Sequence, residues 1–176
     1  MLAGTNAAAR NYSVTNAVEW AKQLNIDGFR ADAIKHVDIS WLTQLRQQIK
    51  TEITSKQTPP QRFYMVGETY DFGNRDVLKA YIDPATKLDG QFDFPLRKNL
   101  VEAVVMRKYQ GMSDLAAFMN GNDFFYGGNA IMSTFIGIHD LPRVIHLAAN
   151  SRLWGDDQGA DGKDRSWSNL PTIPQE

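Results

Sequence analysis

The stretch of sequence that decides the fold is 26-IDGFRADAIKH-36, in which a short apolar strand runs into a charged turn. Side chains alternate along a strand, so Arg30 and Asp32 are expected on one face and Phe29 on the other. We expect the face of Phe29 to pack against covering helices. An acid at the carboxyl end of a buried strand is where α/β folds place their catalytic groups. The stretch therefore predicts an α/β fold with chemistry at the end of this strand.

The alternation of strands and helices continues along the chain and implies βαβ units and a parallel sheet, with about three and a half units in all. An eight-fold α/β barrel takes ~250 residues. The sequence therefore predicts a partial barrel of the (β/α)8 TIM-barrel type over residues 1–150, with a loop or disordered tail at 151–176. The candidate strands are 26–31, 63–66, 91–94 and 131–136; the candidate helices are 16–25 (capped by Ser13 or Thr15), 41–55 (with Ser40 near its start), 75–81, 96–107, 113–119 and 143–150; residues 121–128 are a predicted loop.

The composition is that of an ordinary globular protein. Hydrophobic residues make up 43% and aromatic residues 11% of the 176 residues, and the net charge is -1. A balance this close to neutral indicates neither a nucleic acid nor an acidic membrane surface as partner. Because cysteine is absent, disulfides, thiolate metal sites and a cysteine nucleophile are excluded.

Three acids follow candidate strands in the same way. Asp32, Glu68 and Asp140 each come just after the carboxyl end of a strand, and parallel strands bring such ends to one edge of the sheet. Arg30, two residues before Asp32, is expected to keep that carboxylate ionised and oriented. Glu68 follows apolar residues and has no cationic neighbour in sequence, and an apolar setting raises the pKa of a carboxyl group.

Cleavage of a glycosidic bond requires acidic residues with different roles. One carboxylate attacks the anomeric carbon and one carboxylic acid protonates the leaving oxygen, while a third acid can bind sugar hydroxyls. Each acid alone also has an ordinary interpretation: a structural ion pair for Asp32, a solvated loop acid for Glu68 and a helix cap for Asp140. Their shared placement favours the catalytic interpretation.

Three motifs at these acids resemble those of a known family. The segment 28-GFRADAIKH-36 closely resembles the GFRxDAxKH motif of glycoside hydrolase family 13, the α-amylase family. The segment 66-VGET-69 resembles that family's motif around its acid/base Glu, and 135-FIGIHD-140 resembles its FxxxHD motif. Their order is that of the fourth, fifth and seventh barrel strands, so the resemblance implies a partial barrel covering about strands 4 to 7.

The resemblance also implies a role for each matching residue. Asp32 would be the nucleophile, Glu68 the general acid/base and Asp140 the transition-state stabiliser. Substrate-binding roles would fall to Arg30, Lys35, His36 and His139. The main-chain carbonyl of His36 is implied as a ligand of a structural Ca2+, although the family's upstream Asn-His motif has no counterpart in this sequence.

These roles predict a retaining hydrolase that cleaves internal α-1,4-glucosidic bonds of starch or related α-glucans. A transglycosylase of the same family and a truncated, non-catalytic glucan-binding fragment are the alternatives. The open edges of a partial barrel further predict self-association. No signal peptide or membrane span is visible, so we expect either a cytoplasmic protein or part of a secreted one.

Overall fold

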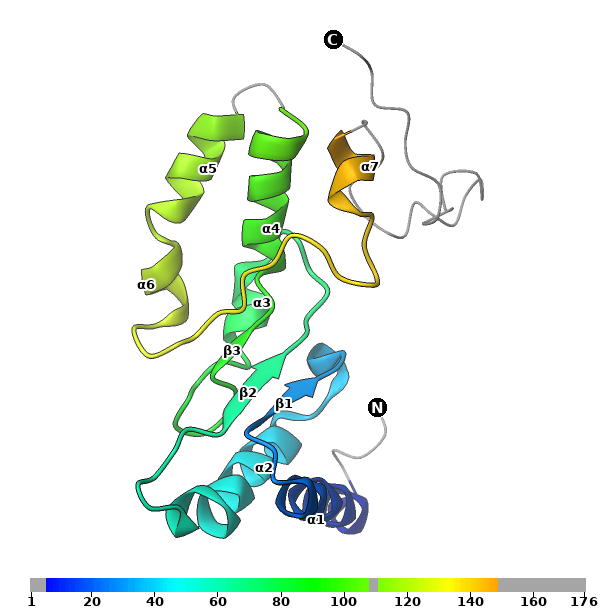
Figure 1. Ribbon diagram of the computed structural model, residues 1–176, viewed down its shortest axis with the longest axis vertical. Helices are drawn as coiled ribbons and strands as arrows, with labels where there is room; N and C mark the ends of the chain where they lie inside the picture. The colour runs from blue at the N-terminus through cyan, green and yellow to red at the C-terminus, as the bar shows by residue number, and fades with distance from the viewer. Residues whose placement is uncertain (1–5, 108–110, 149–176) are drawn as a thin grey trace. The chain divides into compact units, whose positions relative to one another are not determined.

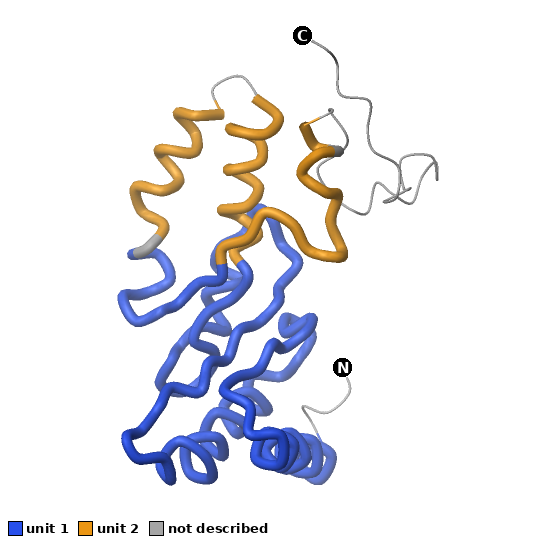
Figure 2. The backbone as a smooth tube through the Cα atoms, in the orientation of Figure 1, with its two compact units in different colours: residues 1–92, 124–133 blue, residues 93–123, 134–176 orange. Residues whose placement is uncertain are grey.

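A computed structural model of the chain describes residues 6–107 and 111–148 (Figure 1). The chain divides into two compact units (Figure 2). Unit 1 comprises Met1–Phe92 and Phe124–Ser133, and unit 2 comprises Asp93–Asp123 and Thr134–Glu176. Each unit is described by itself below. The predicted tail at 151–176 lies outside the described residues.

Unit 1 contains a parallel sheet of three strands in the order β1-β2-β3. These strands are β1 (Gly28–Ala31), β2 (Tyr64–Gly67) and β3 (Gly90–Gln91). The parallel sheet that the sequence predicts is thus confirmed: β1 and β3 are shorter than their candidate ranges, and β2 has the predicted length but lies one residue later. In the register of the first pair, Arg30 lies opposite Val66.

The strand predicted at 131–136 is wrong as a regular element. The chain runs beside β3 there, but it forms only an isolated parallel bridge between Phe92 and Ser133. Two backbone bonds hold it: the Ile131 amide donates to the Asp89 carbonyl at 2.8 Å and the Ser133 amide donates to the Gln91 carbonyl at 2.9 Å. A Cβ at Gly90 would overlap the Ile131 carbonyl oxygen, so only glycine permits this close approach. The ladder ends at Ser133, and Thr134 and the residues after it belong to unit 2.

The first helix, α1 (Ala7–Leu24), begins well before the predicted start at residue 16. Its cap is Asn6, whose side chain accepts a hydrogen bond from the Ala9 amide at 3.1 Å, and neither Ser13 nor Thr15 has that role. The prediction missed the first turns because they are mostly exposed and carry no apolar period. Only Val14, Val18 and Ala21 are buried along the helix.

The other helical segments of unit 1 connect the strands. They are η1 (Ile34–His36), α2 (Ile39–Glu52), η2 (Thr54–Lys56) and α3 (Arg75–Lys79). The side chain of Asp38 caps α2 and accepts a hydrogen bond from the Ser40 amide at 2.8 Å. The helices predicted at 41–55 and 75–81 are therefore confirmed with shifted ends. No helix among the described residues is long and apolar enough to cross a membrane.

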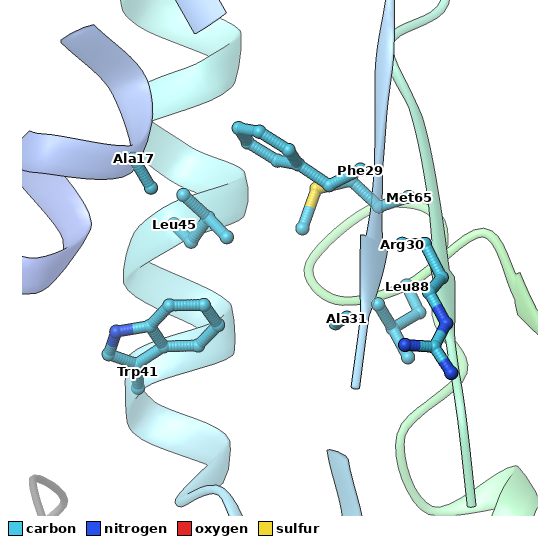
Figure 3. A pocket seen from close by; sticks show the side chains of 8 residues that line it. All are labelled: Ala17, Phe29, Arg30, Ala31, Trp41, Leu45, Met65 and Leu88. Atoms are coloured by element: carbon cyan, nitrogen blue, oxygen red, sulfur yellow. The ribbon is translucent and has the colours of Figure 1, made fainter. Parts of the chain in front are cut away.

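One apolar layer joins α1 and α2 to the sheet, and both helices lie on the same side of β1 and β2 in Figure 1. Phe29 and Ala31 pack against this layer, which confirms the expected apolar face of the strand. A cavity of about 140 Å³ remains within the layer. Figure 3 shows Trp41 and Leu45 of α2 on one side of this cavity and Phe29 on the other.

Over its described residues, unit 2 consists of helices and an irregular segment at 134–143. It contains α4 (Phe94–Leu100), which continues as the π-helix η3 (Val101–Val105), α5 (Gly111–Met119) and α7 (Val144–Ala148). The five-residue helix α6 (Asn122–Tyr126) begins in unit 2 and ends in unit 1. The loop predicted at 121–128 is therefore wrong over α6, where the glycines lie at the two ends of the helix and not inside it.

A buried ion pair connects α2 to the segment before β3. The Arg46 side chain is 5% exposed and the Asp89 side chain 2%, and Arg46 Nη2 lies 2.5 Å from Asp89 Oδ2. Arg46 also donates to the Lys87 and Phe63 carbonyls, at 2.6 and 3.1 Å. The Met65 amide of β2 donates to the same Asp89 oxygen at 2.8 Å. The pair therefore holds one helix to two strands.

Replacing Arg46 with Met is expected to lower the free energy of unfolding by about 3 kcal/mol, because buried Asp89 would keep only the weaker contact with the half-exposed Arg62, whose Nε lies 3.5 Å from Asp89 Oδ1. The matched control is Lys56→Met, which breaks an exposed helix pair between Lys56 and Glu52 and should cost less than about 1 kcal/mol. Urea unfolding followed by circular dichroism measures both. Equal midpoints for the two variants would show that the buried pair does not stabilise the sheet.

Candidate active site

Three of the predicted site residues meet at the carboxyl ends of β1 and β2. Arg30 Nη1 lies 2.6 Å from Asp32 Oδ1, and Arg30 Nη2 lies 2.9 Å from Glu68 Oε2. A single guanidinium fork thus holds one oxygen of each carboxyl group. The close pairing of Arg30 with Asp32 that the sequence predicts is confirmed, and the contact of Arg30 with Glu68 is new.

Arg30, Asp32 and Glu68 lie together because of the register between β1 and β2. Arg30 lies opposite Val66, and Asp32 and Glu68 are each two residues further along, on the same face of neighbouring parallel strands. The Glu68 amide extends the ladder by donating to the Ala31 carbonyl at 2.9 Å. A sequence gives no direct sign of which residues face each other across two strands, so the Arg30–Glu68 contact could not be predicted.

The two carboxyl groups have very different surroundings. The Asp32 side chain is 71% exposed, whereas that of Glu68 is 8% exposed. Burial raises the pKa of Glu68, and a hydrogen bond with the Asp32 side chain and the nearby Asp32 charge raise it further. The Arg30 charge and the Ala33 amide oppose the rise without reversing it. The direction that the sequence predicts for Glu68 is confirmed, although Arg30 is a cationic neighbour in space.

One Glu68 oxygen is unsatisfied among the described residues. Glu68 Oε1 is buried and has no hydrogen-bond partner there. A buried carboxylate oxygen without a donor is costly, whereas a protonated one is tolerated and can donate. The site thus pairs an exposed acid with a buried acid whose pKa is raised. Carboxyl groups in environments this different take different roles in acid–base chemistry.

The raised pKa of Glu68 predicts a pH-dependent stability. A carboxyl group whose pKa is higher in the folded protein stabilises the fold fully below its unfolded pKa, and this contribution is lost as the pH rises through the folded pKa. Glu68→Gln cannot ionise, so the variant should melt at a higher temperature than the wild type at neutral pH. The expected gain is about 1 kcal/mol, or about 2–4 °C.

Calorimetry at several pH values tests this expectation. The gain should shrink as the pH falls toward 4.5, the ordinary pKa of a glutamic acid side chain. A gain that is constant with pH would show that it does not come from the ionisation of Glu68. Glu52 on α2, whose side chain is 44% exposed, is the matched control, since Glu52→Gln should not raise the melting temperature.

Phe92 is a site residue that the sequence analysis missed. The guanidinium carbon of Arg30 lies 5.8 Å from the centre of the Phe92 ring, within the range of a cation–π contact. Phe92 directly follows β3, so the third strand also helps to hold Arg30. The position of Phe92 near the end of a candidate strand could have indicated a site residue. An apolar residue at such a position is more often part of the core.

Lys35 and His36 lie in η1, directly after the turn at Asp32 and Ala33. Lys35 Nζ donates to the Tyr70 carbonyl at 3.0 Å, and the His36 residue is exposed. The structure thus places both close to Asp32 in the chain. It gives Lys35 a contact with the protein backbone that the family motif did not predict.

No cluster of acidic or histidine side chains marks a metal site among the described residues. Ca2+ takes six to eight oxygen ligands, and residues 6–107 and 111–148 hold no group of three or more His, Asp, Glu or Cys side chains suited to a metal. The His36 carbonyl is therefore a single candidate ligand.

His139 and Asp140 lie in unit 2. Their side chains pair with each other, with His139 Nε2 at 3.1 Å from Asp140 Oδ2, and both are well exposed. They follow the segment at which the regular strand was predicted. The structure therefore brings together Arg30, Asp32 and Glu68 in unit 1 and joins His139 to Asp140 in unit 2.

Acids that meet at the carboxyl ends of parallel strands are the arrangement of an α/β barrel with an active site at that edge. The sequence profile described as "Alpha amylase, catalytic domain" matches residues 2–158. The chain belongs to this family, and its fold is part of the family's TIM barrel. The resemblance inferred from the three motifs is confirmed.

Individual relatives agree with this assignment. The chain is 31% identical to an α-amylase of Streptomyces lividans over 129 residues, which are 71% of this chain and 13% of the relative. It is 29% identical to the cytoplasmic α-amylase of Escherichia coli K12 over 119 residues, 65% of this chain and 23% of that protein. The crystal structure of an Anoxybacillus α-amylase superposes with a TM-score of 0.65 at 25% identity, covering 88% of this chain and 32% of that one.

Proposed function

We propose that this chain carries the catalytic acids of a retaining glycoside hydrolase that cleaves internal α-1,4-glucosidic bonds of starch or related α-glucans. The chain spans 13% and 23% of the length of the two α-amylases described above, so the proposal concerns the activity of the protein at its natural length. The α-glucan would be its partner in binding as well as its substrate.

The observation that carries the proposal is the contact of both acids with one guanidinium. Retaining enzymes hold their two carboxyl groups ~5–5.5 Å apart, whereas inverting enzymes separate them by ~6.5–9.5 Å to admit a water molecule. Asp32 and Glu68 share Arg30 and are within hydrogen-bonding reach of each other. This closeness supports direct attack by one acid, with retention of configuration.

In the first step, the Asp32 carboxylate attacks the anomeric carbon while the bond from that carbon to the glycosidic oxygen breaks. The proton of Glu68 passes to the leaving oxygen, and a glycosyl ester of Asp32 remains. The exposure of Asp32 and the raised pKa of Glu68 suit these two roles.

In the second step, the Glu68 carboxylate takes a proton from water, and the oxygen of that water attacks the anomeric carbon. The ester to Asp32 breaks, so both acids return to their starting states and the product keeps the α configuration. A sugar hydroxyl in place of water would give transglycosylation by the same residues.

The remaining motif residues are proposed to act on the substrate. Arg30 orients Asp32 and balances the charge of the pair. Asp140 would stabilise the positive charge of the oxocarbenium-like transition state, and His139 would bind the sugar at the cleavage site. Lys35 and His36 would bind leaving-group sugars. The main-chain carbonyl of His36 would be one ligand of a structural Ca2+.

The test uses a maltoheptaoside blocked at its non-reducing end, so that only internal cleavage releases a new reducing end. The products are analysed by proton NMR within the first minutes. We expect internal cleavage with the α anomer appearing first, before mutarotation. The β anomer appearing first would contradict a retaining mechanism, and a product longer than the substrate would favour the transglycosylase.

A further inference from the structure

The loop after β2 is tied to the turn after β1 at more than one place. The Ile34 amide donates to the carbonyl of Glu68 itself at 2.8 Å. Lys35 Nζ donates to the Tyr70 carbonyl at 3.0 Å. Lys35 is in turn held by its own carbonyl, which accepts a hydrogen bond from the Tyr81 hydroxyl at 3.0 Å. We call this chain of contacts from Tyr81 through Lys35 to Tyr70 the strap.

The backbone is strained at Ala33, two residues before Lys35 of the strap. Ala33 adopts a left-handed conformation with φ 44° and ψ 41°, which is unfavourable for any residue with a Cβ and persists only when its surroundings hold it. This conformation brings the Ala33 amide to the Glu68 carboxyl group. η1, which contains Lys35, begins at the next residue. The strap therefore holds the turn from the side of η1, whereas β1 holds it from the other side.

The contacts of the strap do not require a substrate. Lys35 and Tyr70 are partly buried, and Tyr81 packs against the apolar layer of unit 1. The ammonium group of Lys35 has three N–H donors, and one of them is used here on the backbone. Lys35 can therefore hold the Glu68 loop and still offer a donor to a sugar hydroxyl.

We propose that Lys35 and Tyr81 are positioning residues for Glu68, and that the strap fixes the acid/base against Asp32 before the substrate binds. This inference rests on the proposed function of Glu68. It assigns Tyr81, which is in none of the family motifs found in the sequence, to the function of the site. Without the strap the turn at Ala33 relaxes, the loop after β2 moves outward, and the Glu68 carboxyl group becomes more solvated.

The test compares Tyr81→Phe with Tyr64→Phe. Each variant removes one hydroxyl that donates to a backbone carbonyl of unit 1, since the Tyr64 hydroxyl donates to the Ile131 carbonyl at 2.9 Å. Tyr64 begins β2, at the end of the strand away from Glu68. Misplacing a catalytic group by about 1 Å can cost 10²-fold in rate. We expect about a tenfold lower kcat for Tyr81→Phe with KM within twofold of the wild type, and no change for Tyr64→Phe.

The pH profile separates positioning from a general loss of stability. Loss of burial lowers the pKa of a carboxyl group, so the alkaline limb of kcat/KM should move to lower pH in Tyr81→Phe. Lys35→Met should move it in the same direction, and Lys35→Arg, which keeps the donor, should restore most of the wild-type profile. A structural role alone would lower the amount of folded enzyme and leave the limb in place.

Two outcomes would overturn the inference: a wild-type kcat and pH limb in Tyr81→Phe, or equal losses in Tyr81→Phe and Tyr64→Phe. Carbon NMR of the Glu68 carboxyl group gives a readout that needs no activity. If the wild type releases no sugar, the proposed function fails, while the strap still predicts a lower pKa of Glu68 in Tyr81→Phe than in the wild type. An unchanged pKa in that measurement would overturn the strap by itself.

Discussion

Asp32→Asn is expected to lower kcat on the blocked maltoheptaoside by about 10³- to 10⁵-fold, equivalent to about 4–7 kcal/mol of transition-state stabilisation. The amide is neutral and cannot form the glycosyl ester, so the first step loses its nucleophile. The substitution should leave the fold intact, because the side chain is 71% exposed and exposed ion pairs contribute little to stability.

Asp27→Asn is the matched control for this prediction. Asp27 is exposed and precedes the same strand, at the end away from the site. The control should keep the wild-type kcat, and both variants should melt close to the wild type. If Asp32→Asn retained more than a tenth of the wild-type kcat, Asp32 would not be the nucleophile.

Glu68→Gln is expected to lower kcat by about 10²- to 10⁴-fold, the usual contribution of a general acid–base group. The glutamine has nearly the shape of the acid but carries no transferable proton, so glucan binding should persist. An α-maltosyl fluoride, whose leaving group needs no protonation, should lose much less activity in the first step than the maltoheptaoside.

Glu68→Ala allows a second measurement of the same role. Azide attacks the glycosyl ester without needing a general base, so added azide should raise the turnover of the fluoride substrate and yield an α-glycosyl azide. Glu52→Gln on α2 is the matched control and should behave as the wild type. Loss of glucan binding in Glu68→Gln would assign Glu68 a structural role, and equal losses on both substrates would argue against proton donation.

The sequence predicts this site well where the information is local. The alternation around Phe29 and Arg30 correctly assigns the two faces of β1, and the apolar residues before Glu68 correctly predict the direction of its pKa shift. These features depend on neighbours along one strand. The motif residues Arg30, Asp32 and Glu68 meet because parallel strands end at one edge.

The features that the sequence did not predict depend on contacts between distant segments. The second partner of Arg30 follows from the register of β1 and β2, and Lys35 reaches Tyr70 across two loops. The early start of α1 was missed because the Asn6 cap precedes exposed turns without an apolar period. The segment at 131–136 is apolar like a strand, yet it leaves β3 after one bridge.

The central claim is that Asp32 forms a covalent bond to the sugar while Glu68 transfers the proton. The most direct test is mass spectrometry of the protein at its natural length after reaction with a ring-fluorinated maltosyl fluoride, whose fluorine slows the second step. We expect one added fluorinated maltosyl group on the peptide that contains Asp32, and none in Asp32→Asn. A label on Glu68 or on any other residue would contradict it.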